Sequence, residues 1–372
     1  MIAWFRYICL IVSLIITLPE LLSAQRLVSQ RQEDVEAGLL YNESVYILSN
    51  YSCLSSNSPE KLSLDELLRK QIEGFYFYLK RDTETNVLLL RKPDGTFTPF
   101  SESLEAIKTA LDADSTKVMT LFLDFYVEME LESSFKEIGL MEYVLEYDTK
   151  NGWPSLKDML SSGKRLVVFE VQKHLNSPSW LHNMRDFVEH TDADWGNQPE
   201  GVESFDERLK KNLSLFTGYK FLETSRGNSN DISALARQTP YLIESFKRAW
   251  IRDGRVPNFV LVDKYYAWLD VSLVTFRNFD IIYGAVTNNN ELLNYVNWDG
   301  MSNYTTGKYC FPLEPGAELM LSPISPGYRI EPATVYISGT QRKAFASDFK
   351  ARPLRIDEDI EIYLPFEGDE KD

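Results

Sequence analysis

The sequence is poor in the residues that build metal and redox sites. Its 372 residues include three cysteines and three histidines, which do not combine in a metal-ligand spacing. No glycine-rich loop that could cradle a phosphate group is present, and no serine lies in the sharp-turn motif of a serine hydrolase. These absences argue against a zinc site, a nucleotide-binding loop and a nucleophilic serine.

Positive charge is scarce as well. The chain has 39 lysines and arginines against 55 aspartates and glutamates, which gives a formal net charge of -16. The mean field of such a molecule repels a phosphate backbone, so nucleic acid is not an expected partner. An anionic lipid surface is also disfavoured, because no run of basic residues overrides this field.

The longest apolar run lies at the N-terminus. A positive residue, an apolar stretch over residues 7–18 and small residues before Gln25 follow the order of a secretory signal peptide. A membrane anchor is the alternative, but the stretch is shorter than the roughly 20 residues that span a bilayer, and Pro19 interrupts it. We expect a signal peptide over residues 1–24, cleavage near Ala24–Gln25, and a secreted or periplasmic mature chain without a transmembrane segment.

Cleavage there would leave two cysteines, Cys53 and Cys310. An exported protein could join them in a disulfide. Two separate thiols are equally consistent with the sequence.

Residues 153–170 contain a complete step from helix to strand. Ser155 followed by Asp158 can cap a short helix, and Gly163 is placed to end it. The unbroken apolar run over residues 166–169 is typical of a parallel strand covered on both faces. The segment therefore predicts an α/β protein.

Strands and helices continue to alternate along most of the chain. Periodicity predicts helices starting near residues 63, 100 and 240, and strands over residues 45–48, 75–79, 86–91, 118–123 and 258–262. This order fits a barrel or an open doubly wound sheet. Residues 304–372 are rich in proline and show period-two alternation, which predicts a small β-rich domain.

Three blocks resemble the X domain of phosphatidylinositol-specific phospholipase C. Residues 153–169 (WPSLKDMLSSGKRLVVF) resemble a recurrent block of that domain, residues 100–107 an early helix and residues 255–266 a late strand, in family order. The resemblance favours the barrel. It implies a phospholipase-C-like (β/α)8 TIM barrel over residues 25–303, followed by the β-rich domain.

The family's catalytic pair is missing from this sequence. In the family one histidine takes a proton from the inositol hydroxyl and a second protonates the leaving group. Asn50 stands at the counterpart of the first and Arg91 at that of the second, and neither titrates near neutrality. All three histidines come later in the chain, so misalignment cannot restore the pair: His174, His182 and His190.

A residual pocket could remain at later strand ends. Asp124 and Asp263 match acidic positions of the family, and Glu170 and Tyr265 lie at comparable places. We expect Arg91 to point into the barrel mouth and pair with Asp124 or Asp263, which would make an anion site. The alternative is an outward Arg91 beside a turn.

The histidines have simpler interpretations. His174 follows a strand end and could form a relocated site with Glu170, although a loop histidine is the alternative. His182 and His190 are expected on a solvated helix face.

The functional expectation is an exported barrel protein that binds a ligand or partner without the two-histidine chemistry. The ligand would be a phosphorylated small molecule or a lipid headgroup, and no cofactor or metal is expected. The alternative is an active phosphoric diester hydrolase with a rearranged site, acting on phosphatidylinositol or glycerophosphodiesters. Only that alternative would involve calcium.

Overall fold

The computed structural model describes most of residues 31–355. The gaps are residues 50, 54–62, 71, 93, 127–130, 148–149, 173, 193–214, 220–246, 248–249, 252–253, 255, 263–276, 302–303, 306 and 340–341. The chain divides into two compact units, Met1–Ala249 with Arg255–Phe279 and Trp250–Gly254 with Asp280–Asp372. The predicted signal peptide and most of the helix expected near residue 240 lie outside the described residues.

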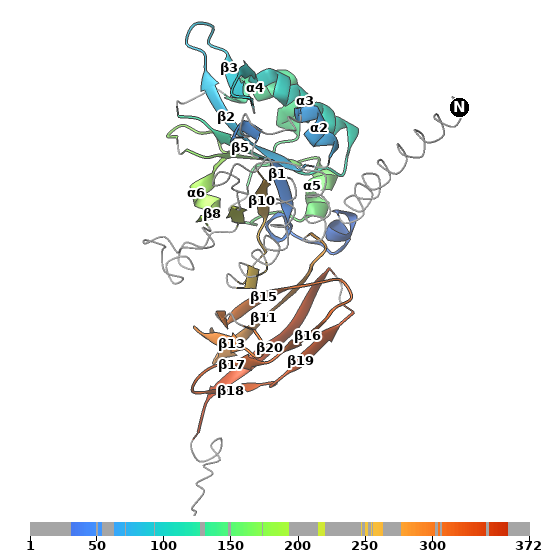
Figure 1. The fold of residues 1–372 in the computed structure, drawn as a ribbon, viewed down its shortest axis with the longest axis vertical. Helices are drawn as coiled ribbons and strands as arrows, with labels where there is room; N and C mark the ends of the chain where they lie inside the picture. The colour runs from blue at the N-terminus through green and yellow to red at the C-terminus, as the bar shows by residue number, and fades with distance from the viewer. Residues whose placement is uncertain are drawn as a thin grey trace, which may run out of the picture. The chain divides into compact units, whose positions relative to one another are not determined.

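Parallel strands form the centre of the first unit (Figure 1). In chain order they are β1 (Tyr46–Ser49), β2 (Gly74–Arg81), β5 (Met119–Asp124), β6 (Leu166–Glu170), β7 (Leu181–Asn183), β8 (Val188–Asp192), β9 (Leu215–Tyr219) and β10 (Phe259–Val262). Each pairs with the next in parallel register, and β1 also pairs with β10; among the described residues only the step from β7 to β8 has no ladder. First strand beside last is the topology of a (β/α)8 barrel, so the predicted fold is confirmed.

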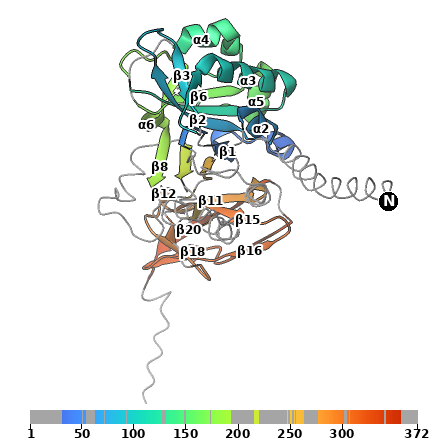
Figure 2. The same cartoon turned by 45° about the horizontal axis from the view of Figure 1, so that its top comes forward.

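Short helices cover the outside of these strands. They are α2 (Leu64–Arg69), α3 (Phe100–Ala113), α4 (Leu131–Ile138), α5 (Leu156–Ser162) and α6 (Met184–Phe187), with 3-10 turns η1 (Tyr41–Glu43), η2 (Tyr51–Cys53) and η3 (Leu140–Glu142). Figures 1 and 2 show α3 and α4 together on one side of the strands. The predicted cap is present, because the Ser155 side chain accepts from the Asp158 N–H, and Gly163 ends α5 at φ 74°.

The strand predicted over residues 86–91 forms but is not a barrel strand. β3 (Leu88–Arg91) pairs antiparallel with β2, and β4 (Phe97–Pro99) pairs antiparallel with β3. The tight turn before β3, in which Asp82 N–H donates to Val87 O, can join only antiparallel neighbours. The hairpin therefore extends β2 beyond the parallel ladder.

Aromatic rings pack inside the barrel, and one glycine occupies a position that has no room for a side chain. Phe122 and Phe169 are partners in the β5–β6 ladder and stack with centroids 5.1 Å apart, and Phe259 meets Phe122 edge-on at 5.3 Å. Gly74 begins β2 opposite Thr120, where an added Cβ would lie 2.2 Å from the Thr120 carbonyl oxygen and 2.2 Å from Leu48 Cδ2. Only glycine fits that position without displacing backbone.

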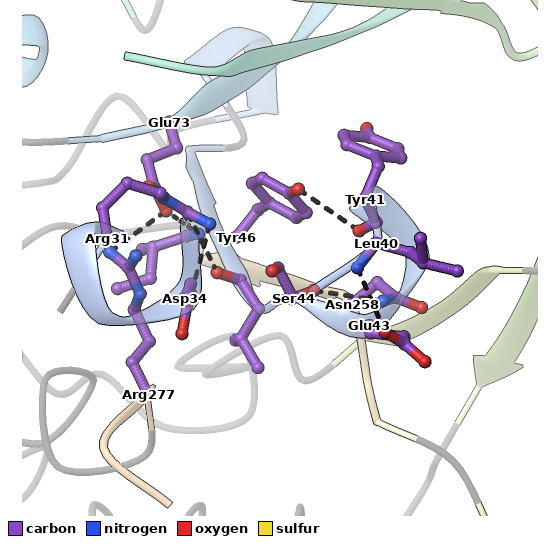
Figure 3. Close-up of polar contacts among 12 residues, drawn as sticks. Arg31, Asp34, Leu40, Tyr41, Glu43, Ser44, Tyr46, Glu73, Asn258 and Arg277 are labelled. Carbon is purple, nitrogen blue, oxygen red and sulfur yellow. Dashed lines mark hydrogen bonds and ion pairs between the residues drawn. The ribbon is translucent and has the colours of Figure 1, made fainter. Parts of the chain in front are cut away.

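Buried charges lie at the amino ends of the first strands (Figure 3). Arg31 Nη2 lies 2.5 Å from Glu73 Oε1, and Arg277 Nη1 lies 3.2 Å from Glu73 Oε2. Arg31 also pairs with Asp34 at 3.3 Å, and the Ile47 N–H donates to Glu73 Oε2. This Glu73 cluster joins the segment before β1 to the start of β2 and to a residue that follows β10.

The second unit is built from strands, as the period-two alternation predicts. They are β11 (Asp280–Asn288), β12 (Glu291–Leu292), β13 (Val296–Trp298), β14 (Tyr304–Thr305), β15 (Lys308–Leu313), β16 (Glu318–Leu321), β17 (Pro323–Ile324), β18 (Tyr328–Glu331), β19 (Val335–Ser338) and β20 (Lys343–Pro353). Their core is aromatic, with Trp298, Tyr309, Phe311 and Phe349 in contact. The strands of this unit begin with β11 at Asp280, because β11 pairs with both β15 and β20, so the unit includes residues that the sequence prediction gave to the barrel domain.

Cys310 is buried in this unit. Its Sγ accepts a hydrogen bond from Trp250 Nε1 at 3.0 Å. The side chain of Cys53 lies outside the described residues, so a disulfide between Cys53 and Cys310 stays a prediction, as do two separate thiols. Among the described helices, none has the length and apolar character needed to cross a bilayer.

Gly74→Ala should lower the free energy of unfolding of the first unit by about 3 kcal/mol or more, because the added methyl group meets a backbone carbonyl that cannot swing away. Gly95→Ala is the matched control. Gly95 has φ 83° and open space around a Cβ, so only backbone strain of about 1 kcal/mol is expected there. Urea denaturation measures both values, and equal losses would contradict the packing argument.

Candidate functional site

Asp124 ends β5 at the carboxyl edge of the barrel strands, where active sites of this topology lie. Its side chain alternates with those of Leu123 and Phe125 and shares the interior face with Phe122. Asp124 is only 9% exposed. Its Oδ2 accepts a hydrogen bond from the Tyr76 hydroxyl at 2.7 Å, whereas its Oδ1 is buried and has no donor in the described part of the chain.

Two more tyrosines lie beside this carboxylate. Tyr78 is the ladder partner of Asp124, so both side chains leave the same face of the sheet. Tyr126 follows Asp124 by two residues, and its ring centroid lies 6.2 Å from that of Tyr78 at an interplanar angle of 60°. Tyr126 is 70% exposed. We call Tyr76, Tyr78 and Tyr126 the tyrosine cluster.

Glu170 lies at the same edge of the sheet as Asp124, but its side chain leaves the opposite face. It is the ladder partner of Leu123, one residue out of phase with Asp124, and is 1% exposed. Its carboxylate accepts from Ser177 Oγ at 2.5 Å and Asn183 Nδ2 at 3.2 Å. Every oxygen of Glu170 is therefore engaged within the protein, in contrast to Asp124.

His174 completes the Glu170 contacts. Its Nδ1 lies 3.1 Å from Glu170 Oε2, and its ring stacks on Phe125 with centroids 4.4 Å apart at 8°. The structure thus brings His174 to Glu170 as the sequence suggested, but it separates this pair from Asp124. A carboxylate that orients an imidazole is an arrangement found in general bases. Here it also ties the loop after β6 to the strand.

The predictions for Arg91 and His182 are wrong where the structure describes them. Arg91 is exposed on β3 of the antiparallel hairpin, and the Asp124 side chain bonds Tyr76 instead. The anion site formed by Arg91 with Asp124 is therefore absent. His182 is not on a solvated helix but on β7, 4% exposed, with Nε2 donating to Leu145 O at 3.2 Å. Burial lowers the pKa of the His182 imidazole.

Some predicted residues fall outside the description. Asn50, Asp263 and Tyr265 lie outside the described residues, as does the side chain of His190. Near Asn50, the Ser52 hydroxyl accepts from the Tyr78 N–H at 2.8 Å and donates to Arg91 O at 3.0 Å. This segment is thus fixed to β2 and β3 through Ser52.

Sequence reasoning missed the tyrosine cluster. Four aromatic residues directly follow Gly74 in the sequence. Their period-two spacing, with Tyr76 and Tyr78 on one face and Phe75 and Phe77 on the other, was the available signal. Among the described histidines, cysteines and acidic residues, no group of three or more could hold a metal ion.

Comparisons with known proteins agree with the resemblance drawn from the sequence. Residues 90–199 match the model of the family described as PI-PLC X 1, which confirms the likeness to the X domain. No curated protein matches the sequence. Phosphatidylinositol-specific phospholipase C from Listeria monocytogenes superposes with a TM-score of 0.41 at 13% identity, over 64% of this chain and 94% of its own. A mutant of the Staphylococcus aureus enzyme gives 0.39 at 13%, over 63% and 94%.

The lowered pKa of His182 predicts a specific pH dependence. The unfolded imidazole binds a proton near pH 6.5, whereas the buried one resists protonation, so the unfolded state holds more protons below that pH. The free energy of unfolding should therefore fall as the pH drops from 7 toward 5. Urea denaturation of wild type and His182→Gln at pH 7.5 and 5.5 tests this. The variant should lose less stability between the two pH values, and an identical loss would contradict the assignment.

Proposed function

We propose that this protein uses a phospholipase-C-like barrel to bind a small ligand at the edge formed by Asp124 and the tyrosine cluster, without two-histidine acid–base catalysis. The observation that supports this proposal most directly is the Asp124 carboxylate, which is buried at the carboxyl end of β5 and has one oxygen without a partner among the described residues. A buried polar atom without a partner costs free energy that a bound donor would recover. The matched X-domain segment includes Asp124.

The side chains described around Asp124 favour binding over proton transfer. Tyr76 and Tyr78 offer hydroxyl groups and ring faces to a ligand, and Tyr76 already donates to Asp124 Oδ2. His182 lies in the aromatic core, where its Nε2 already donates to Leu145 O. His174 lies with Glu170 on the opposite face of β5 and β6. The ligand would be a small molecule or a lipid headgroup.

The rival function is phosphoric diester hydrolysis with a rearranged site. The observation that favours it is the pair of Glu170 and His174, because a carboxylate holding Nδ1 leaves Nε2 for proton transfer. In that case the reaction would occur on the Glu170 face, not at Asp124. Calcium would then be a possible requirement, as in the alternative drawn from the family.

Purified full-length protein should not hydrolyse phosphatidylinositol or glycerophosphodiesters above the rate of an Asp124→Asn variant, with or without calcium. Release of inositol phosphate and glycerol phosphate measures the rate. The rival predicts turnover that His174→Ala abolishes and Leu175→Ala preserves, since Leu175 is a fully exposed neighbour. Turnover lost in Asp124→Ala would overturn the proposal directly.

We also propose that the protein is exported, which the order of charged, apolar and small residues before Gln25 supports. Expression in a secreting host should yield a mature chain whose N-terminus is Gln25, because small residues precede it at the expected cleavage position. Mass spectrometry of the exported protein tests this. A chain that keeps residues 1–24 and sediments with membranes would instead indicate an anchor.

A further inference from the structure

Among the residues that the structure describes, no cation pairs with the Asp124 carboxyl group. Within that part of the chain its side chain makes one hydrogen bond, from the Tyr76 hydroxyl. By comparison, the buried Glu73 is paired with two arginines, Arg31 and Arg277. Buried carboxylates in proteins are normally paired with a cation or bound to a metal, because an isolated one is costly. A ligand can therefore supply the positive charge that the described residues do not place at Asp124.

The neighbouring rings suit a cation. Tyr78 leaves the same face as Asp124, and Tyr126 lies two residues beyond it, with the two ring planes inclined at 60° and centroids 6.2 Å apart. The negative face of an aromatic ring attracts an ammonium group within about 6 Å of its centroid. Tyr126 is 70% exposed, so the approach to the carboxylate begins at a ring that solvent already reaches. The net charge of -16 adds a long-range attraction for cations.

The hydrogen-bond donors at Asp124 limit further which kind of ligand fits the site. Asp124 Oδ1 has no donor, so the ligand must present a hydrogen as well as a positive charge. A quaternary ammonium has no such hydrogen. A metal ion would need more ligands, and the described residues provide no cluster of three acidic, histidine or cysteine side chains. A primary ammonium meets both requirements.

We infer that the Asp124 site binds a primary ammonium group, with Oδ1 accepting its N–H and the Tyr78 and Tyr126 rings facing its charge. This inference rests on the proposed function and names the ligand class of the same site. It differs from the anionic ligand that the Arg91 prediction implied. The shared chemistry is that of a free alkylamine or an ethanolamine lipid headgroup.

The test uses ethylammonium chloride as the probe on the full-length protein, followed by ligand-observed NMR. With three non-hydrogen atoms, its dissociation constant should be on the order of 1 mM. Asp124→Asn keeps the shape but removes the charge, and should weaken binding about tenfold or more. Tyr126→Ala should weaken it about threefold. Tyr336→Ala is the matched control, because Tyr336 is a 78% exposed tyrosine of the second unit, and it should leave affinity unchanged.

Two further probes separate the alternatives. Tetramethylammonium should bind more weakly than ethylammonium, since it cannot donate to Oδ1. Calcium chloride and myo-inositol should show no binding that depends on Asp124. Asp124-dependent binding of calcium or inositol without binding of ethylammonium would overturn the ammonium assignment while leaving a non-catalytic binding site. Equal ethylammonium affinity of wild type and Asp124→Asn would also overturn it.

A last arm distinguishes the two sources of the ammonium. Vesicles of phosphatidylcholine with and without phosphatidylethanolamine are sedimented with wild type and with Asp124→Asn. Asp124-dependent recruitment by the ethanolamine lipid supports a headgroup as the ligand, and recruitment of neither protein supports a free amine. Hydrolysis of phosphatidylinositol is assayed separately, so failure of the proposed function is distinguishable from failure of this inference.

Discussion

The arrangement of the first unit depends on Glu73, a buried carboxylate one residue before β2. Its two carboxylate oxygens pair with Arg31 and Arg277, and one of them also accepts a hydrogen bond from the Ile47 N–H. Removing one member of such a group typically costs about 3–5 kcal/mol, because a buried charge is left without compensation. The cluster thereby fixes the segment before β1, the start of β2 and the chain that follows β10 to one another. These contacts hold the amino ends of β1 and β2 together.

The position of β2 then determines what lies at the opposite edge. Gly74 allows β2 to approach Thr120 closely, and the parallel register with β5 sets Tyr76 and Tyr78 beside Phe122 and Asp124. Because side chains alternate along a strand, Asp124 and Glu170 separate onto two faces although both end neighbouring strands. One carboxylate is saturated with hydrogen bonds, and the other keeps an oxygen free. This difference, rather than the number of acidic residues, is the reason for proposing Asp124 as the binding group.

The match to the X domain and the side chains at the Asp124 edge support different functions. A barrel of this topology can support many chemistries, so fold likeness alone does not assign one. Of the described histidines, His182 donates to Leu145 O in the core, and His174 contacts Glu170 and Phe125. The conclusion about function therefore rests on particular side chains at one edge. Different contacts of these side chains would change the conclusion about function, whereas the fold alone does not decide it.

Local signals in the sequence determined the elements. The cap at Ser155, the stop at Gly163 and the apolar strand over residues 166–169 depend on residues close together in the chain, and the structure has each of them. The alternation of strands and helices predicted a barrel or an open doubly wound sheet, and the family resemblance favoured the barrel. The period-two tyrosines of β2 were present in the sequence, but their meaning depended on which face β5 presents to them. Only the tertiary structure decided that Arg91 leaves the barrel on a hairpin, that His182 is buried and that none of the described cations pairs with Asp124. Pairing and desolvation are settled by neighbours distant in sequence, so no local pattern carries them.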